Sequence, residues 1–284
     1  MNTSPRGIQT GSAIIPDDAH LPYPRFCAHR GFSTIAPENS MPAFGAAIAL
    51  GAEEIEFDLW YTKDGEIVSC HDSKLDRVST GTGFIYEHTY EELMQLDFGS
   101  KFSDKYEGLK IIKFEEILQK YACQVIMNVH IKDLGDETEY DEALLQKIVD
   151  LIDKYDARQH VYFLTGNDGV LKALARIAPD IALGCGEHMK TIHGEEPMWI
   201  VERAIELGCK KLQFFKSERL GKRFFNKEMV DKAHEHGIIC NVFFADDPEE
   251  AMEYLDWGID VILTNDYQKV SNYCRAKLAE RAAK

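Results

Sequence analysis

Long apolar segments are missing from this sequence of 284 residues. No run approaches the about 18 consecutive apolar residues that a membrane-spanning helix needs. Residues 1–24 likewise lack the apolar stretch of a secretion signal, although removal of such a signal would leave the same start. We therefore expect a cytoplasmic protein with no integral membrane segment.

An excess of basic residues is also missing. The chain has 32 Lys and Arg residues against 48 Asp and Glu residues, which gives a net charge of −16. This balance disfavours nucleic acid and anionic membrane surfaces as partners. A small anionic substrate is compatible with it, provided that a metal ion or a few basic side chains supply positive charge locally.

Paired cysteine motifs are absent as well. The sequence has 7 Cys residues and no C-x-x-C spacing. An odd number without this spacing disfavours a disulfide framework or a zinc cluster. Because most of these cysteines lie within or beside apolar runs, we expect them to be reduced and buried.

A repeated order of strand and helix patterns begins at residue 25. Short apolar runs, which indicate buried strands, alternate with longer segments of helical pattern. Eight such strands over about 250 residues predict an α/β fold, the (β/α)8 TIM-type barrel. A doubly wound sheet is the alternative, but the Gly-rich first turn that it would want is lacking. The predicted strands are Arg25–Ala28, Glu54–Leu59, Gln124–Ile131, His160–Leu164, Ile181–Cys185, Lys211–Phe215, Ile238–Phe244 and Asp260–Leu263.

One apolar run breaks the repeat. Glu66–Cys70 follows the second predicted strand after Lys63-Asp64-Gly65, a link far too short for a parallel crossover. We therefore expect an inserted antiparallel hairpin, followed by a small helical insertion between barrel strands 2 and 3, over about residues 61–123. The predicted organisation is an N-terminal extension, residues 1–24, and a single barrel domain, residues 25–284.

Carboxylates occur at alternate positions of the second predicted strand. Glu56 and Asp58 share one face of that strand, because side chains alternate across a strand. Two buried carboxylates require positive charge between them, and a hard divalent cation would supply it. A buried Arg or Lys partner, or a solvent-facing Glu56 near the rim, would explain the pattern equally well.

The third predicted strand carries polar side chains in the same alternation. Asn128, His130 and Lys132 share one face, so His130 is a candidate third metal ligand and Lys132 a candidate phosphate-binding residue. A lone His on a strand is more often a satisfied core or surface residue. Three polar residues on one face of an apolar strand favour the functional interpretation.

Two further histidines lie near the predicted barrel mouth. His29 ends the first predicted strand, and His71 ends the hairpin. Cleavage of a phosphodiester needs a base for the nucleophile and an acid for the leaving oxygen, and two imidazoles suit these tasks. Taken alone, His71 would be interpreted as a surface residue of a loop.

A series of short motifs strengthens this interpretation. They are His29-Arg30-Gly31, Pro37-Glu38-Asn39-Ser40, Ala43-Phe44, Gly51-Ala52, Ile55-Glu56-Phe57-Asp58, Thr62-Lys63-Asp64-Gly65, Val68-Ser69-Cys70-His71-Asp72 and Thr264-Asn265-Asp266. In combination and spacing they resemble the glycerophosphodiester phosphodiesterase family, over residues 25–267 and most densely over residues 27–72.

The resemblance implies an enzyme, a phosphoric diester hydrolase that cleaves small glycerophosphodiesters to glycerol 3-phosphate and an alcohol. It also implies one divalent cation, Mg²⁺, Mn²⁺ or Ca²⁺. By position, the resemblance makes His29 and His71 the acid/base pair, Glu56 and Asp58 metal ligands, Arg30 and Lys132 phosphate-binding residues, and Glu38 and Asn39 residues that line the same end of the barrel.

The chain departs from the family pattern at three positions. His130 stands where the family usually has Glu, Phe243 where it has Trp, and Asp246 where it has Asn. An imidazole in place of a carboxylate lowers the negative charge of the predicted site, which disfavours Ca²⁺ and makes Zn²⁺ a further candidate. Two alternatives stay open: a related phospholipase-D-like or phosphoinositide-type phosphodiesterase, and a barrel that binds a phosphate ester without cleaving it.

Overall fold

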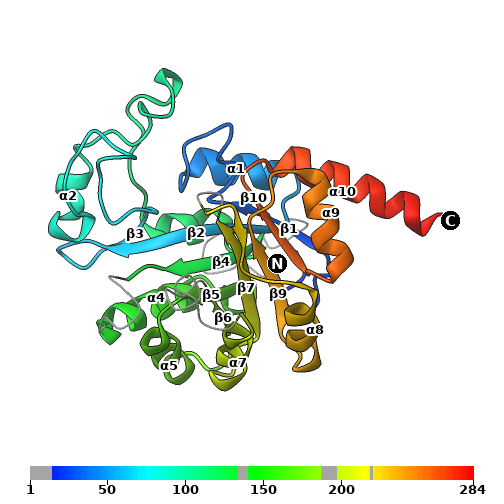
Figure 1. The fold of residues 1–284 in the computed structure, drawn as a ribbon. Coiled ribbons are helices and arrows are strands. Elements are labelled where there is room, and N and C mark those ends of the chain that lie inside the picture. The colour runs from blue at the N-terminus through cyan, green and yellow to red at the C-terminus, as the bar shows by residue number, and fades with distance from the viewer. Residues whose placement is uncertain (1–14, 134–139, 187–196, 218–219) are drawn as a thin grey trace, which may run out of the picture.

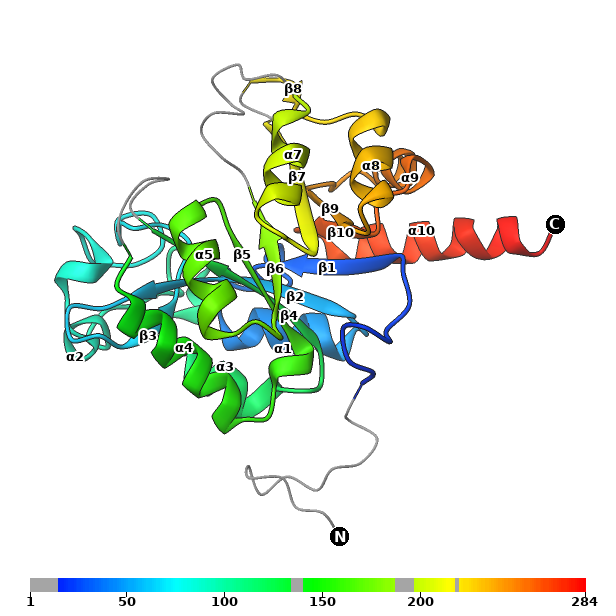
Figure 2. The same ribbon diagram turned by 90° about the horizontal axis from the view of Figure 1, so that it is seen from below.

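A computed structural model describes residues 15–133, 140–186, 197–217 and 220–284 of the protein. Parallel strands form a closed barrel, with helices around its outside (Figures 1 and 2). The barrel closes because β1 pairs in parallel with both β2 and β10. Its eight strands are β1 (Arg25–His29), β2 (Glu54–Tyr61), β4 (Ile126–Ile131), β5 (Val161–Thr165), β6 (Ala182–Cys185), β7 (Lys211–Ser217), β9 (Ile239–Phe243) and β10 (Val261–Thr264).

The outer helices follow the predicted pattern, and side-chain caps fix several of their starts. The Ser40 hydroxyl accepts a hydrogen bond from the backbone N–H of Ala43 at the start of α1, and the Asp247 carboxylate caps α9. Gly258 ends α9 in the left-handed conformation, with φ 99°. The helices are α1 (Met41–Ala49), α2 (Tyr90–Leu93), α3 (Phe114–Tyr121), α4 (Glu142–Lys154), α5 (Asp168–Ile177), α7 (Trp199–Glu206), α8 (Lys227–Glu235), α9 (Pro248–Trp257) and α10 (Tyr267–Ala282).

The predicted barrel and its hairpin are confirmed. Strand β3 (Ile67–Ser69) runs antiparallel to β2, with Leu59 opposite Ser69. The following segment projects from one side of the barrel (Figure 1) and contains two short 3-10 helices, Ile85–Glu87 and Asp104–Tyr106. A separate apolar cluster holds this insertion against the hairpin; it comprises Trp60, Val68, Cys70, Leu75, Ile85, Leu93 and Ile111.

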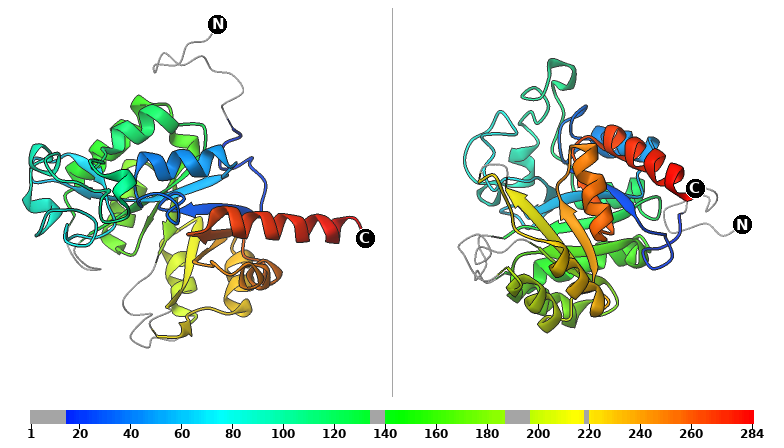
Figure 3. Two further views of the ribbon diagram at one scale, coloured as in Figure 1. Left: turned by 90° about the horizontal axis from the view of Figure 1, so that it is seen from above. Right: turned by 45° about the vertical axis from the view of Figure 1, so that its right-hand side comes forward.

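Helices surround the barrel strands (Figure 3), and buried apolar residues of both form the main core. All seven cysteines are free and buried, as the sequence predicts. Within the described part of the chain, no helix is both long and apolar enough to cross a bilayer.

Charged side chains occupy the interior of the barrel at the amino-terminal ends of its strands. Arg25 is fully buried, and its Nη1 atom donates to Glu54 Oε1 at 2.9 Å and to Asp18 Oδ1 at 2.6 Å. Lys211 donates to the same Asp18 oxygen at 2.9 Å, and the Tyr162 hydroxyl donates to Glu54 Oε2 at 2.9 Å. Asp18 lies in the segment before β1, so this segment closes the end of the barrel opposite the predicted site.

The buried Arg25–Glu54 pair generates a prediction about stability. Arg25→Met removes the guanidinium that Glu54 and Asp18 share. Tyr162 and Lys211 remain, but the buried Glu54 loses its direct ion pair and water cannot replace it, so the free energy of unfolding should fall by about 3–5 kcal/mol. Urea titration followed by circular dichroism measures this loss.

Arg281→Met is the matched control. Its pair with Asp256 is about half exposed on both sides, at 54% and 51%, so the loss should stay below about 1 kcal/mol. Equal losses in the two variants would show that the buried pair has no special role in stability.

Candidate active site

Polar side chains from three adjacent strands meet at the carboxyl ends of the barrel strands. The parallel register pairs His29 of β1 with Glu56 of β2, and pairs Asp58 of β2 with His130 of β4. Asn128 lies beside Glu56 in the same register. Because these strands are hydrogen-bonded neighbours, side chains that point inward at the same level must contact one another. The predicted grouping therefore forms inside the barrel mouth.

Asp58 is surrounded by donors. Lys132 Nζ lies 3.0 Å from Asp58 Oδ1, and His130 Nδ1 lies 3.3 Å from the same oxygen. Asn39 Nδ2 donates to Asp58 Oδ2 at 2.9 Å, while Asn39 Oδ1 accepts from the Asp58 backbone N–H at 3.0 Å. Arg30 Nε is 3.6 Å from Asp58 Oδ2. Burial opposes ionisation of this carboxyl, but the Lys132 ammonium and its other neighbours hold the pKa of Asp58 well below its usual value.

Glu56 is equally buried but has weaker partners. Its Oε2 atom accepts from the Arg30 backbone N–H at 3.0 Å and lies 3.7 Å from His29 Nε2. Its Oε1 atom lies 3.8 Å from His130 Nδ1. Burial, together with the adjacent Asp58 charge, raises the pKa of Glu56 to about 8. Glu56 is thus a buried carboxyl whose charge the neighbouring side chains do not fully compensate.

The residues present fit a divalent cation. One ligand atom from each of Glu56, Asp58 and His130 lies within 4.8 Å of the other two. Burial and the Lys132 charge lower the pKa of His130 to about 4, so its imidazole is neutral and has a lone pair to offer. The buried side-chain amide of Asn128 has no hydrogen-bond partner among the described residues, which is consistent with an ion or water at this level.

His29 is held in place by side chains that follow the last two barrel strands, β9 and β10. Its Nδ1 atom lies 2.7 Å from Asn265 Oδ1, and Asn265 Nδ2 donates to Asp246 Oδ2 at 2.8 Å. A carboxylate can only accept, so Asp246 sets the orientation of the amide, and the proton of His29 must be on Nδ1. Burial and the Arg30 charge lower the pKa of His29 to about 3. The ring packs against Phe243, with centroids 4.8 Å apart.

His71 lies two residues after the end of β3, where the hairpin returns toward the barrel mouth. Its backbone carbonyl accepts from Trp60 Nε1 at 3.0 Å, and its Nδ1 atom lies 2.6 Å from Asp72 Oδ1. The side chain is 32% exposed, so His71 is more accessible than His29. The hydrogen bond with His71 is the main factor that lowers the pKa of Asp72.

The loop between β1 and α1 contributes the other predicted residues. Arg30 and Asn39 both have positive φ angles, 58° and 55°, which turn this loop back over the strand ends. Arg30 Nη1 donates to Glu38 Oε1 at 3.1 Å. Glu38 therefore contacts two guanidinium groups, those of Arg30 and Arg77, whereas Asn39 holds Asp58.

Residues 29–269 match the glycerophosphoryl diester phosphodiesterase family. The chain belongs to this family. It is therefore a phosphoric diester hydrolase, and family membership supports the hydrolysis of glycerophosphodiesters.

Individual relatives agree with this assignment. The chain is 29% identical over 251 residues to a glycerophosphodiester phosphodiesterase of Caldanaerobacter subterraneus, covering 87% of this chain and 96% of the relative. It is similar, with a TM-score of 0.73 and 25% identity, to an Oleispira antarctica phosphodiesterase solved with the product sn-glycerol-3-phosphate, covering 89% and 97% of the two chains. A Silicibacter pomeroyi structure, at 19% identity and a TM-score of 0.76 over 91% and 95% of the chains, shares the fold.

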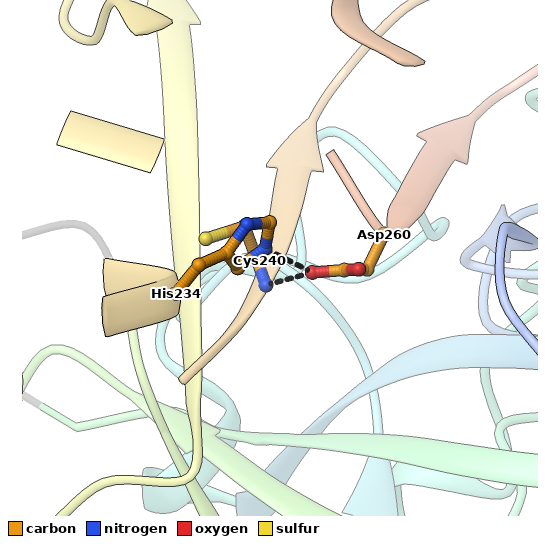
Figure 4. A group of neighbouring side chains, drawn as sticks. All are labelled: His234, Cys240 and Asp260. Atoms are coloured by element: carbon orange, nitrogen blue, oxygen red, sulfur yellow. Dashed lines mark hydrogen bonds and ion pairs between the residues drawn. The ribbon is translucent and has the colours of Figure 1, made fainter. Parts of the chain in front are cut away.

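A second group of side chains of the kinds that can bind a metal ion lies at the other end of the barrel. His234, Cys240 and Asp260 offer ligand atoms within 4.8 Å of one another. Figure 4 shows two hydrogen bonds that converge on Asp260: one from the Cys240 backbone N–H at 2.7 Å and one with His234 Nε2 at 2.9 Å. The Cys240 thiol is buried and lies near backbone carbonyls, and burial holds its pKa above the usual value. These contacts describe a structural link between α8, β9 and β10.

Several residues of the site were not predicted from the sequence. Asn265 and Asp246 orient His29, and Asp72 orients His71. Asn265 and Asp72 stand inside the family motifs, which was the available signal, but a motif does not show which atoms meet. A cavity of about 140 Å³ adjoins His71 between the β1–α1 loop and the insertion, and its lining includes Glu38, Arg77 and Phe102.

The donor set predicts a change in metal preference. His130→Glu replaces a neutral nitrogen with an anionic oxygen beside Glu56 and Asp58, so Ca²⁺ affinity should rise by at least about 10-fold relative to Mn²⁺. Isothermal titration calorimetry of the two ions measures this ratio.

His236→Glu is the control, since it adds the same charge on an exposed residue of the outer surface. An unchanged ratio of Ca²⁺ to Mn²⁺ affinity in His130→Glu would show that residue 130 does not contact the ion.

Proposed function

We propose that this enzyme hydrolyses small, water-soluble glycerophosphodiesters to glycerol 3-phosphate and an alcohol, with one divalent cation at Glu56, Asp58 and His130. His29 and His71 act as the acid/base pair in this proposal. The observation that carries it is the buried Glu56 beside Asp58, whose negative charge the neighbouring side chains do not fully balance. Next to this pair lie two oriented imidazoles, one from β1 and one from the hairpin.

The charges of the site support a cation. Glu56 and Asp58 face the cationic side chains of Arg30 and Lys132, so these four groups together are neutral when all are ionised. A phosphodiester would add one negative charge, and more charge develops on its oxygens as the bond breaks. A divalent cation would supply the missing positive charge at the phosphoryl oxygens. Arg30 and Lys132 would hold the phosphate from either side.

The hydrogen-bond partners of the two histidines favour different roles. The proton of His29 is on Nδ1, toward Asn265, which leaves the lone pair of Nε2 to accept a proton from the attacking hydroxyl. Asp72 holds the Nδ1 atom of His71, which leaves Nε2 to face the substrate and suits a donor to the leaving alkoxide. The attacking group is water or the neighbouring glycerol hydroxyl of the substrate. A cyclic glycerol phosphate in the product mixture would identify the second route.

The test is turnover of glycerophosphocholine and glycerophosphoethanolamine with Mg²⁺, Mn²⁺, Ca²⁺ or Zn²⁺ supplied singly, with release of glycerol 3-phosphate as the readout. His29→Ala and His71→Ala should each lower kcat by about 10²- to 10⁴-fold, the usual contribution of a general acid or base.

His234→Ala is the matched control, because His234 also pairs with an aspartate, at 2.9 Å, but at the other end of the barrel. It should retain kcat. Wild-type rates in either active-site variant would contradict the proposed roles, and an intact diester that stays bound with every metal would favour a binding protein. Faster hydrolysis of lipid vesicles than of soluble diesters would favour a phospholipase-type activity.

A further inference from the structure

Arg77 belongs to the insertion, outside the barrel strands, yet its guanidinium reaches two carboxylates of the site. Arg77 Nε donates to Asp72 Oδ2 at 2.6 Å and Nη2 to Asp72 Oδ1 at 2.9 Å. Nη1 donates to Glu38 Oε2 at 2.9 Å and Nη2 to Glu38 Oε1 at 2.8 Å. Each carboxylate thus receives a two-pronged pair of hydrogen bonds, which only the planar fork of arginine can provide.

Both carboxylates also bind residues of the proposed mechanism. Asp72 Oδ1 contacts His71 Nδ1 at 2.6 Å, and Glu38 Oε1 accepts from Arg30 Nη1 at 3.1 Å. Arg77 therefore connects the segment that carries His71 with the loop that carries Arg30. A continuous chain of charged hydrogen bonds runs from His71 through Asp72, Arg77 and Glu38 to Arg30.

Rotation of the Asp72 side chain would change which proton His71 presents. Asp72 follows His71 directly and is 28% exposed, so without Arg77 its carboxylate could turn toward water. The two bonds from Arg77 fix both oxygens and leave Oδ1 aimed at His71 Nδ1. This keeps the proton of Nδ1 in place and the Nε2 atom of His71 available for the substrate.

A role in attaching the insertion explains Arg77 less well. The insertion already has its own apolar cluster, which includes Trp60 and Val68 of the hairpin. The Arg77 side chain is 48% exposed, and exposed ion pairs add little to stability.

We propose that Arg77 is a positioning residue, which acts through Asp72 to keep the Nδ1 proton of His71 directed at Asp72 and the Nε2 atom toward the substrate. The doubly protonated ring would then give its Nε2 proton to the leaving alkoxide, and the neutral ring that remains would keep its proton on Nδ1. The proposal rests on the proposed function, because it takes His71 as the proton donor.

The first experiment compares steady-state kinetics of the metal-loaded wild type with Arg77→Ala and Arg77→Lys on glycerophosphoethanolamine. Arg77→Ala should lower kcat about 10- to 100-fold, as loss of an orienting partner does elsewhere, and change KM by less than about twofold. Arg77→Lys should be intermediate, because ammonium supplies charge without the fork. Added guanidinium should restore part of the kcat of Arg77→Ala, but not of Asp72→Ala.

Arg158→Ala is the matched control. Arg158 also bridges two carboxylates, those of Asp153 and Asp180, and it lies just before β5 at the opposite end of the barrel. Its kcat should equal that of the wild type. If Arg77→Ala retains wild-type kcat, or if guanidinium gives no recovery, the proposal is wrong.

A second measurement separates this proposal from the proposed function. Nitrogen-15 NMR of the neutral form of the His71 side chain should show a single Nδ1–H tautomer in the wild type and a mixture of tautomers in Arg77→Ala, whether or not the protein turns over a diester. An unchanged tautomer in Arg77→Ala would overturn the positioning role. A wild type that shows the tautomer but no hydrolysis would overturn the proposed function. If Arg77→Ala fails to fold, Arg77→Lys decides both measurements.

Discussion

Three carboxylates on one face of β2 point into the barrel, and the rest of the structure must compensate them. Glu54, Glu56 and Asp58 are all nearly inaccessible to solvent, and a buried charge without partners is unstable by several kcal/mol. Glu54 is compensated by Arg25 and by the Tyr162 hydroxyl, with Lys211 adding favourable charge nearby. The segment before β1 completes that group through Asp18. Of the three carboxylates toward the interior, Glu56 has the weakest partners.

The group around Glu54 is structural, whereas the group around Glu56 and Asp58 forms the candidate active site. Asp58 keeps its charge because Lys132 and Asn39 contact it directly. Glu56 has a backbone N–H and two imidazoles, and its pKa rises to about 8. The other two carboxylates of β2, Glu54 and Asp58, each have a cationic side chain as a direct partner. Among the described residues, Glu56 has none within direct contact, so a ligand cation fits beside it.

The two histidines are held by different parts of the chain. His29 is oriented by Asn265 and Asp246, which follow the last two barrel strands. His71 is oriented by Asp72, and Asp72 by Arg77 of the insertion. Closing the barrel brings the first group together, whereas docking of the insertion brings the second. In the proposed mechanism, the insertion therefore contributes to the chemistry of the mouth as well as to its shape.

The sequence by itself determined the barrel, the antiparallel hairpin and the grouping of Glu56, Asp58 and His130, because strand periodicity and neighbouring parallel strands fix which side chains share a face. The predicted strand ends were less accurate: β4 begins at Ile126 rather than Gln124, because pairing with β2 starts only at Ile126. Only the tertiary structure decided the partners of His29 and of Arg77. Asn265 and His29 are 236 residues apart, and Arg77 and Glu38 are 39 residues apart. Such contacts depend on how the barrel closes and where the insertion docks, and no local pattern encodes either.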